Sequence, residues 1–457
     1  MRSFFNRTHG VVLFAAALAS GSIPDAHAND GKSVGIKAEL AQGVLTTGIS
    51  NKTYIRISVT PMRPQTSRKS PVDVALVIDR SGSMASERRI ENAREAARMA
   101  VERLGAEDIL AVVSYDNKIA IDVPATKMTD HYEVKRKIAK LTPRGSTAIH
   151  AALLAGAKEV RKFKSRERVN RIVLISDGLA NVGPRNPSDF VALGHELASE
   201  GMTVSTIGLG TGYNEDLMAG LARAADGGHV FVQESADLAD FLAKEFNDAQ
   251  NIIGQEVEII IRLKDGFRPL RSLGRQADIS KSKREITYKV GTLMGGVEQV
   301  VLAEIDADAA SAGLSEAQVA DITVSYTDVA TGERKTATTS ASVSFDSDRA
   351  RAEKSVNATV MKDVATLVSR AQRQEAITLR DEGKLKEAQK KFKENAAYVR
   401  SQQRSLSGGA DYAPLADELK ANELAASPAA QSQAGWQKAR KIQRATDSNK
   451  FGSSMKY

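Results

Sequence analysis

Between residues 72 and 250, short apolar runs alternate with longer stretches whose apolar positions recur at helical spacing. The short runs are typical of buried strands and the longer stretches of amphipathic helices. Strands are expected at 72–78, 109–115, 171–175, 203–207 and 228–232, and helices at 87–104, 147–163, 187–199, 214–224 and 237–250. This alternation predicts an α/β domain over residues 71–250, with a doubly wound, mostly parallel sheet covered by helices on both faces.

A different pattern flanks this region on both sides. Residues 54–59 alternate apolar and polar positions, as in a half-buried strand. After the α/β domain, further strands are expected at 257–263, 285–290, 297–305, 322–326 and 336–345, with a hairpin turn at Thr331-Gly332. These strands predict an antiparallel β-sandwich over 251–346. It lacks a strand of its own, so we expect segment 29–70 to complete it and the α/β domain to be inserted in it.

Two further segments follow the predicted sandwich. Residues 347–406 are rich in Ala, Lys, Glu and Gln, contain no Pro and are interrupted by Gly383, which predicts an α-helical hairpin. Part of it resembles one tetratricopeptide-type hairpin, but no second copy is present to form a solenoid. Residues 407–457 turn to Ser, Gly, Ala and Gln, which predicts a largely disordered tail with a short helix near Trp436.

The N-terminus has the pattern of a secretory signal. Arg2 and Arg7 precede an apolar run at 11–19, and Ala26-His27-Ala28 fits an A-x-A cleavage site. The run is shorter than the roughly 20 residues that a membrane span needs. We therefore expect a signal peptide at 1–28, cleaved after Ala28, and no transmembrane segment in the mature chain. The expected location is the periplasm, the cell surface or the medium.

The amino-acid composition limits the kinds of functional site that the chain can form. Cys is absent, which excludes disulfides, thiolate metal sites and Cys nucleophiles. The formal net charge is +8, and segment 349–404 holds 14 basic and 7 acidic residues. That segment is either a solvated helix face or a surface for an anionic partner. Export and the lack of interleaved aromatic residues argue against nucleic acid as the partner.

Three oxygen-rich motifs lie where strands or loops meet helices. Asp79-Arg80-Ser81-Gly82-Ser83 follows strand 72–78, Gly145-Ser146-Thr147 opens a helix, and Ser176-Asp177-Gly178 follows strand 171–175. Ligands of open α/β sheets bind outside the carboxyl ends of the strands, so these motifs are expected to converge. A donor set of carboxylates and hydroxyls favours Mg²⁺, with Mn²⁺ or Ca²⁺ as alternatives.

These motifs resemble the metal-ion-dependent adhesion site of von Willebrand factor type A domains and integrin inserted domains. The matching metal-site residues are Asp79, Ser81, Ser83, Thr147 and Asp177. The resemblance implies that the hydroxyls bind the metal directly, that the aspartates often act through water, and that a protein ligand supplies an Asp or Glu carboxylate. It also implies that helix 237–250 can shift when the affinity of the site changes. The alternative is a type A scaffold that binds a metal only for its structure, or binds none.

The remaining motifs give weaker evidence about function. Gly208 to Gly212 follows a strand but lacks the spacing of a dinucleotide loop, and no G-x-S-x-G nucleophile motif is present. His150 is expected on a helix surface or behind the metal ligands, and Arg80 either in solvent or beside an acidic ligand. The wider arrangement resembles exported bacterial type A proteins and, distantly, inter-alpha-trypsin inhibitor heavy chains. We therefore expect a metal-dependent binding or adhesion protein and not an enzyme. The alternative is a non-catalytic accessory or assembly factor of an envelope complex that docks through its helical hairpin.

Overall fold

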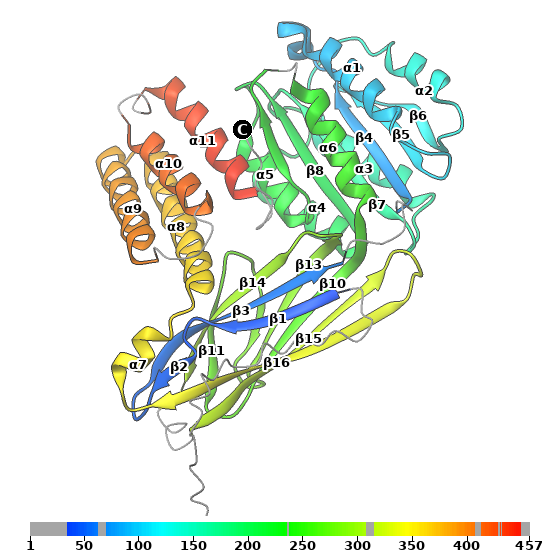
Figure 1. Cartoon of the computed structure of the whole chain (residues 1–457). Helices are drawn as coiled ribbons and strands as arrows, with labels where there is room; N and C mark the ends of the chain where they lie inside the picture. Colours follow the sequence, from blue (N-terminus) through cyan, green and yellow to red (C-terminus); the bar gives the residue numbers. More distant parts are fainter. Residues whose placement is uncertain are drawn as a thin grey trace, which may run out of the picture.

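A computed structural model of the chain describes residues 34–62, 70–234, 237–307, 315–406, 413–427, 430 and 432–448. The predicted signal peptide at 1–28 lies outside the described residues. Figure 1 shows a β-sandwich, an α/β unit next to it, and a group of C-terminal helices beside both. Among the described residues, no helix is both long and apolar enough to cross a membrane.

The α/β unit is built on one six-stranded sheet, in the order β6-β5-β4-β7-β8-β9. Five strands are parallel, and the edge strand β6 runs antiparallel to β5. The strands are β4 (Val72–Asp79), β5 (Ile109–Tyr115), β6 (Ile119–Lys127), β7 (Val169–Ser176), β8 (Met202–Leu209) and β9 (His229–Val232). The strand order reverses between β4 and β7, so the carboxyl ends of these two strands mark the expected ligand position.

Helices cover both faces of this sheet. They are α1 (Arg89–Val101), α2 (His131–Ile138), α3 (Ile149–Arg161), α4 (Pro187–Ser199), α5 (Glu215–Ala224) and α6 (Leu238–Gln250). Side chains along β4 alternate between the faces: Leu76 and Ile78 belong to a core shared with α1 and α6, and Val77 belongs to a core shared with α3, α4 and α5. The predicted doubly wound fold class is confirmed.

Two sheets form the sandwich. One has the order β1-β3-β14-β11 and the other β12-β13-β10-β15-β16-β2. The strands are β1 (Val34–Leu40), β2 (Val44–Thr46), β3 (Asn51–Pro61), β10 (Ile252–Leu263), β11 (Phe267–Leu273), β12 (Asp278–Ser280), β13 (Glu285–Met294), β14 (Gln299–Ala307), β15 (Glu316–Asp328) and β16 (Arg334–Asp346). Because β3 pairs with β14, strands from before and after the α/β unit share one sheet. The α/β unit is therefore an insertion in the sandwich.

The sandwich departs from the sequence expectation in two respects. The short strands β11 and β12 were not expected, and β2 pairs with β16 in parallel, not antiparallel. In β11, Phe267, Pro269 and Leu273 are buried at alternate positions, and the exposed Arg271 interrupts this pattern. The hairpin between β15 and β16 is present as expected, with Gly332 at φ +69° in its turn.

The C-terminal helices are α7 (Arg349–Lys354), α8 (Ala358–Asp381), α9 (Leu385–Ser405), α10 (Ala413–Ala426) and α11 (Gln433–Ser448). Gly383, at φ +81°, lies in the turn between α8 and α9. The expectation of a largely disordered tail over 407–457 is wrong for α10 and α11. The physical reason is long-range burial, because Trp436 packs against Phe392 and Glu418 is fully buried between α8 and α10 in an ion pair with Arg373. In Figure 1, α11 lies between this helical group and α5.

Candidate metal centre

All five predicted site residues converge at the carboxyl ends of β4 and β7. Asp79 ends β4, Asp177 directly follows β7, and Thr147 lies two residues before α3. Ser81 and Ser83 lie at the start of the 3-10 turn Gly82–Arg88 that leads into α1. Asp79, Ser81, Thr147 and Asp177 are buried, whereas Ser83 is exposed. The site therefore has a buried floor of carboxylates and one open side.

Asp79 is held in place by two hydrogen bonds. The backbone N–H of Ser81 donates to its Oδ1 at 2.8 Å, and the Ser176 hydroxyl donates to its Oδ2 at 2.6 Å. Burial raises the pKa of Asp79 to about 6, and the charge of Asp177 adds to this effect while the bonds from Ser176 and Ser81 oppose it. A nearby positive charge favours the ionised form of such a carboxyl. A cation in this site would therefore stabilise the ionised form of Asp79.

The hydroxyls form a chain that leads to the second carboxylate. The Oγ atoms of Ser81 and Ser83 lie 3.1 Å apart, and Ser83 donates to Asp177 Oδ1 at 2.7 Å. A Cβ placed on Gly178 would lie 3.4 Å from Thr147 Oγ1 and 3.5 Å from Ser83 Oγ. The hydroxyls of Thr147 and Ser83 therefore border the same small space, which the missing side chain of Gly178 leaves open.

Backbone hydrogen bonds tie the three loops together. Gly82 N–H donates to the carbonyl of Gly145 at 3.1 Å, and Thr147 N–H donates to Asn181 Oδ1 at 2.7 Å. Gly145 is needed at its position, since its φ is +69° and a Cβ there would lie 2.5 Å from Asn117 Oδ1. These bonds hold the hydroxyl donors in place before any ligand binds.

The donor set suits a hard cation. Within the described residues, no group of three or more His, Cys, Asp or Glu side chains has metal-ligand spacing. The present site has two carboxylates and three hydroxyls, and such oxygen donors are typical for Mg²⁺ and similar ions and poor for Zn²⁺. The residues therefore fit a divalent cation of the magnesium type.

Of the two expectations about neighbouring residues, the one for Arg80 needs revision. Arg80 is neither solvent-exposed nor free for a ligand: only 7% of it is exposed, and its Nε lies 3.1 Å from Asp116 Oδ2. The turn after Asp79 folds this side chain inward, where the carboxylate of Asp116 compensates its positive charge. His150 is partly buried on α3, where its ring packs edge-on against Phe190 at 5.6 Å.

Sequence reasoning missed Arg89, and it named Ser176 within the third motif without giving it a role. Arg89 Nη1 donates to Asp177 Oδ2 at 2.7 Å, which gives this buried aspartate a positive neighbour. A signal for Arg89 exists in the sequence, because Arg is unfavourable in the first turn of a helix unless something compensates its charge. The role of Ser176 has no local signal, since the carboxylate that its hydroxyl orients lies 97 positions away in the chain.

Comparisons with known proteins agree with this geometry. Residues 73–245 match the family model of the von Willebrand factor type A domain. An uncharacterized protein of Synechocystis is 24% identical over 62% of this chain and 68% of its own length. The protein YfbK of Escherichia coli is 24% identical over 47% of this chain, and inter-alpha-trypsin inhibitor heavy chain H3 of Pongo abelii is 26% identical over 43%. These matches span 38% and 23% of those two relatives.

Two solved structures share the fold over nearly the whole chain. A von Willebrand factor type A protein from Catenulispora acidiphila has a TM-score of 0.71 at 14% identity, covering 90% of this chain and 96% of that one. The ArnB paralog VWA2 from Sulfolobus acidocaldarius has a TM-score of 0.62 at 17% identity, covering 92% and 100%. With the family match and the converging site, these likenesses identify the inserted unit: residues 73–245 are a von Willebrand factor type A domain.

Proposed function

We propose that this chain is an exported binding protein whose type A domain uses a divalent metal ion to hold an acidic side chain of a protein partner. Type A domains mediate protein–protein interactions and typically bind a divalent metal at this position. The observation that carries the proposal is the convergence of three hydroxyls and two carboxylates at the ends of β4 and β7, next to the open space at Gly178. Mg²⁺ is the proposed metal, with Mn²⁺ or Ca²⁺ as alternatives.

Each side chain has a separate role in this proposal. The hydroxyls of Ser81, Ser83 and Thr147 would hold the ion, and Asp79 and Asp177 would supply negative charge from the buried floor. Ser176 orients Asp79 through its 2.6 Å hydrogen bond. The three hydroxyls are neutral donors, so an ion that they hold directly keeps most of its charge and remains attractive to a further acidic oxygen from outside.

We propose a binding role and no catalytic one. A nucleophilic Ser or Thr needs a base that is free to take its proton. The carboxylate that accepts from the Ser83 hydroxyl belongs to Asp177, which also pairs with Arg89. This pairing supports a site that grips a ligand rather than one that transforms it.

Calorimetry of the purified mature chain with Mn²⁺ and Mg²⁺ tests the metal site. Ser81→Ala is expected to weaken Mn²⁺ binding at least tenfold, because it removes one proposed ligand. Ser165→Ala, in an exposed loop of the same domain, is the matched control and is expected to bind as the parent does. Lack of uptake by the parent chain at millimolar metal would contradict the proposal.

The partner is tested by capture from envelope extract. Capture is expected with Mg²⁺ and lost with EDTA or in Ser81→Ala, whereas Ser165→Ala retains it. Fractionation of cells that make the full chain tests export, and accumulation of the uncleaved chain in the cytoplasm would contradict it.

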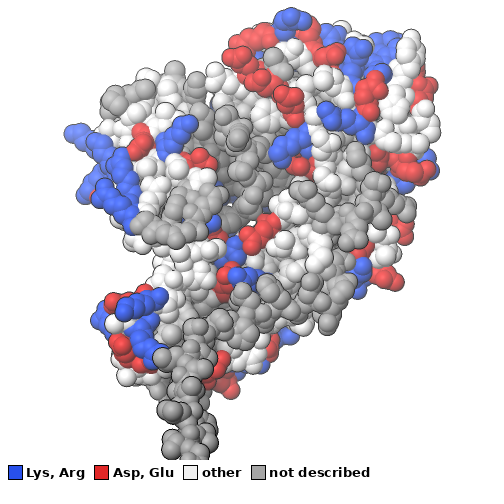
Figure 2. All heavy atoms as spheres, in the orientation of Figure 1, with Lys and Arg blue, Asp and Glu red and all other residues white. Residues whose placement is uncertain are grey.

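One observation supports the alternative role as an assembly factor that docks through its helices. Lys386, Lys390, Lys393, Arg400 and Arg404 are exposed along α9. Figure 2 shows basic side chains gathered over this part of the molecule. Several of them have acidic neighbours, as in the Arg400–Glu423 ion pair, so the surface is only moderately cationic. Capture that survives EDTA but is lost when Lys386, Lys390 and Lys393 are replaced by Gln would favour this alternative.

A further inference from the structure

Arg89 lies between the proposed metal site and a neighbouring groove. Its guanidinium donates to Asp177 Oδ2 at 2.7 Å and to Glu87 Oε2 at 2.6 Å. The Asp177 side chain is fully buried, and that of Arg89 is 14% exposed. Because Ser83 occupies Oδ1 of Asp177, both oxygens of this carboxylate are engaged within the protein.

The backbone that carries Arg89 adopts an unfavourable conformation. Glu87 and Arg88 both lie in the left-handed region, at φ 52° and 54°. Consecutive residues other than Gly in this region cost about 1 kcal/mol or more each. Arg88 is also the N-cap of α1 and makes no side-chain capping bond. At the point where Arg89 is directed to Asp177, the backbone therefore has both unfavourable φ values and a helix start without a side-chain cap.

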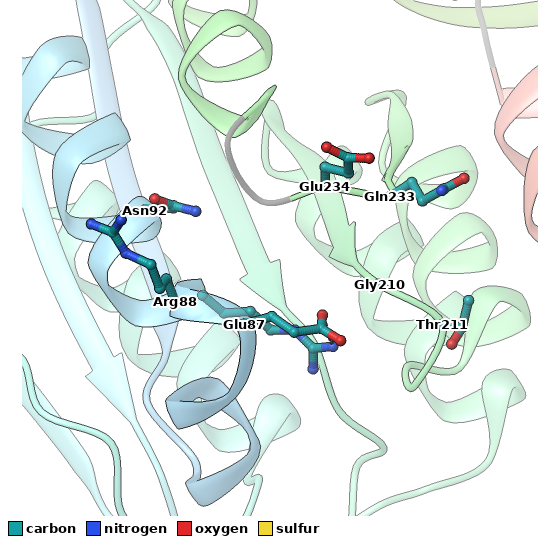
Figure 3. Close-up of a pocket in the computed structure, with 8 residues that line it drawn as sticks. Glu87, Arg88, Asn92, Gly210, Thr211, Gln233 and Glu234 are labelled. Carbon is teal, nitrogen blue, oxygen red and sulfur yellow. Dashed lines mark hydrogen bonds and ion pairs between the residues drawn. The ribbon is translucent and has the colours of Figure 1, made fainter.

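The groove next to Arg89 has a volume of about 610 Å³. It lies between the start of α1 and the loops that follow β8 and β9 (Figure 3). Its lining residues are Glu87, Arg88, Arg89, Asn92, Gly210, Thr211, Gln233 and Glu234. An anion that enters this groove from solvent can therefore reach the same guanidinium that holds Asp177.

We propose that Arg89 is a built-in counter-charge that competes with the metal ion for Asp177 and so makes metal binding depend on an acidic partner. This inference rests on the proposed function. A cation at the site and the guanidinium both require the negative charge of Asp177, and they repel each other. An arriving carboxylate relieves this conflict by joining Glu87 as a counter-ion of Arg89 on the groove side. Metal and acidic partner then strengthen each other's binding.

Mn²⁺ titration calorimetry of four full-length mature proteins tests this inference. Arg89→Gln is expected to bind Mn²⁺ about tenfold more tightly than the parent, and Arg89→Lys, which keeps the charge, is expected to lie close to the parent. Arg88→Gln is the matched control, since Arg88 lines the groove with the same charge, whereas Arg89 is the residue that pairs with Asp177. Repeating the titrations in sodium acetate is expected to strengthen Mn²⁺ binding more in the parent than in Arg89→Gln.

Thermal unfolding gives a second readout, which can still be interpreted if Arg89→Gln is less stable than the parent. Without metal, Arg89→Gln leaves Asp177 buried without its cation, so its melting temperature is expected to fall. Saturating Mn²⁺ is expected to raise that temperature more than it does in the parent, because tighter binding stabilises by mass action. Equal Mn²⁺ affinities of the parent and Arg89→Gln would overturn this inference alone. No Mn²⁺ uptake by either protein would overturn the proposed function as well.

Discussion

The ammonium group of Lys441 on α11 lies 4.3 Å from the centroid of the Tyr213 ring and donates a hydrogen bond to the Tyr213 carbonyl at 2.9 Å. The same group pairs with Glu215 at 2.5 Å, and only 2% of Lys441 is exposed. Tyr213 belongs to the loop after β8, in which Gly212 packs so closely that a Cβ would lie 2.9 Å from the carbonyl oxygen of Asp177. The C-terminal helix is therefore in contact with a loop that borders the metal site.

This contact predicts that α11 stabilises the type A domain. Lys441→Met leaves Glu215 buried with Arg440 as its one positive partner among the described residues, so we expect the free energy of unfolding to fall by about 3 kcal/mol. Urea unfolding of the mature chain measures the change, with exposed Lys420→Met as the control, expected within about 0.5 kcal/mol. Adding Glu215→Gln should recover part of the loss. Equal effects of the Lys441 and Lys420 substitutions would contradict this role.

Gly178→Ala separates metal binding from folding. The new methyl group would lie 3.4 Å from Thr147 Oγ1 and 3.5 Å from Ser83 Oγ, which is ordinary contact in the absence of metal. We expect Mn²⁺ affinity to fall at least tenfold, because the methyl occupies space between two proposed ligands, and the melting temperature to stay near that of the parent. Gly105→Ala, where the nearest atom is at 3.8 Å, is the control in the same domain. Unchanged Mn²⁺ binding in Gly178→Ala would place the metal elsewhere.

The buried carboxyl group of Asp73 on β4 predicts a loss of stability as the pH rises from acidic to neutral. It is fully buried, and among the described residues neither carboxylate oxygen has a hydrogen-bond partner. Burial raises the pKa of Asp73 to about 7 from the usual 3.8. The folded chain thus holds the proton more tightly, and the associated stability is lost as pH rises from about 4 to about 7.

Asp73→Asn removes this titration. Relative to the parent, the variant is expected to gain stability between pH 4 and pH 8, by up to about 4 kcal/mol. Urea unfolding at the two pH values measures the difference, and exposed Asp417→Asn serves as the control. A difference between Asp73→Asn and the parent that does not change with pH would refute the assignment.

The buried ring of His229 on β9 predicts a loss of stability as the pH falls. Thr206 Oγ1 donates to the Met218 carbonyl at 3.0 Å, so it accepts from His229 Nδ1, and His229 Nε2 accepts from the Tyr213 hydroxyl. Burial lowers the pKa of His229 to about 3 from the usual 6.5. The stability from the neutral ring is present above pH 6.5 and is lost as pH falls toward 3.

His229→Phe tests this chain of hydrogen bonds. At pH 7 we expect a loss of about 1–3 kcal/mol from the broken bonds to Tyr213 and Thr206. At pH 4.5 the variant is expected to be about 2 kcal/mol closer to the parent, because only the parent loses stability by protonation of the unfolded chain. Urea unfolding at both pH values measures this, and parallel curves for the two proteins would show that His229 does not titrate as described.

Local patterns in the sequence were sufficient for the α/β unit and for most of the sandwich. The apolar run of β4 predicts a buried parallel strand whatever surrounds it, because its pattern reflects burial on both faces. The five residues of the proposed metal site could be named in advance, because their motifs resemble the family's metal site and strand ends in such sheets lie along one edge. Edge strand β6 and short strand β11 escaped this reasoning because their apolar positions are few and interrupted.

The order and spacing of residues along the chain were enough to predict the sheet, the insertion and the residues that meet at the carboxyl edge. Three contacts depend on how the distant parts of the chain fold together: Arg80 turns inward to Asp116, Arg89 reaches Asp177, and α11 is ordered against Tyr213. They form because a buried charge is stable only beside its counter-charge. Asp177 lies 88 residues from Arg89, and Tyr213 lies 228 residues from Lys441. Such partners are found by the fold and leave no periodic signal in the sequence.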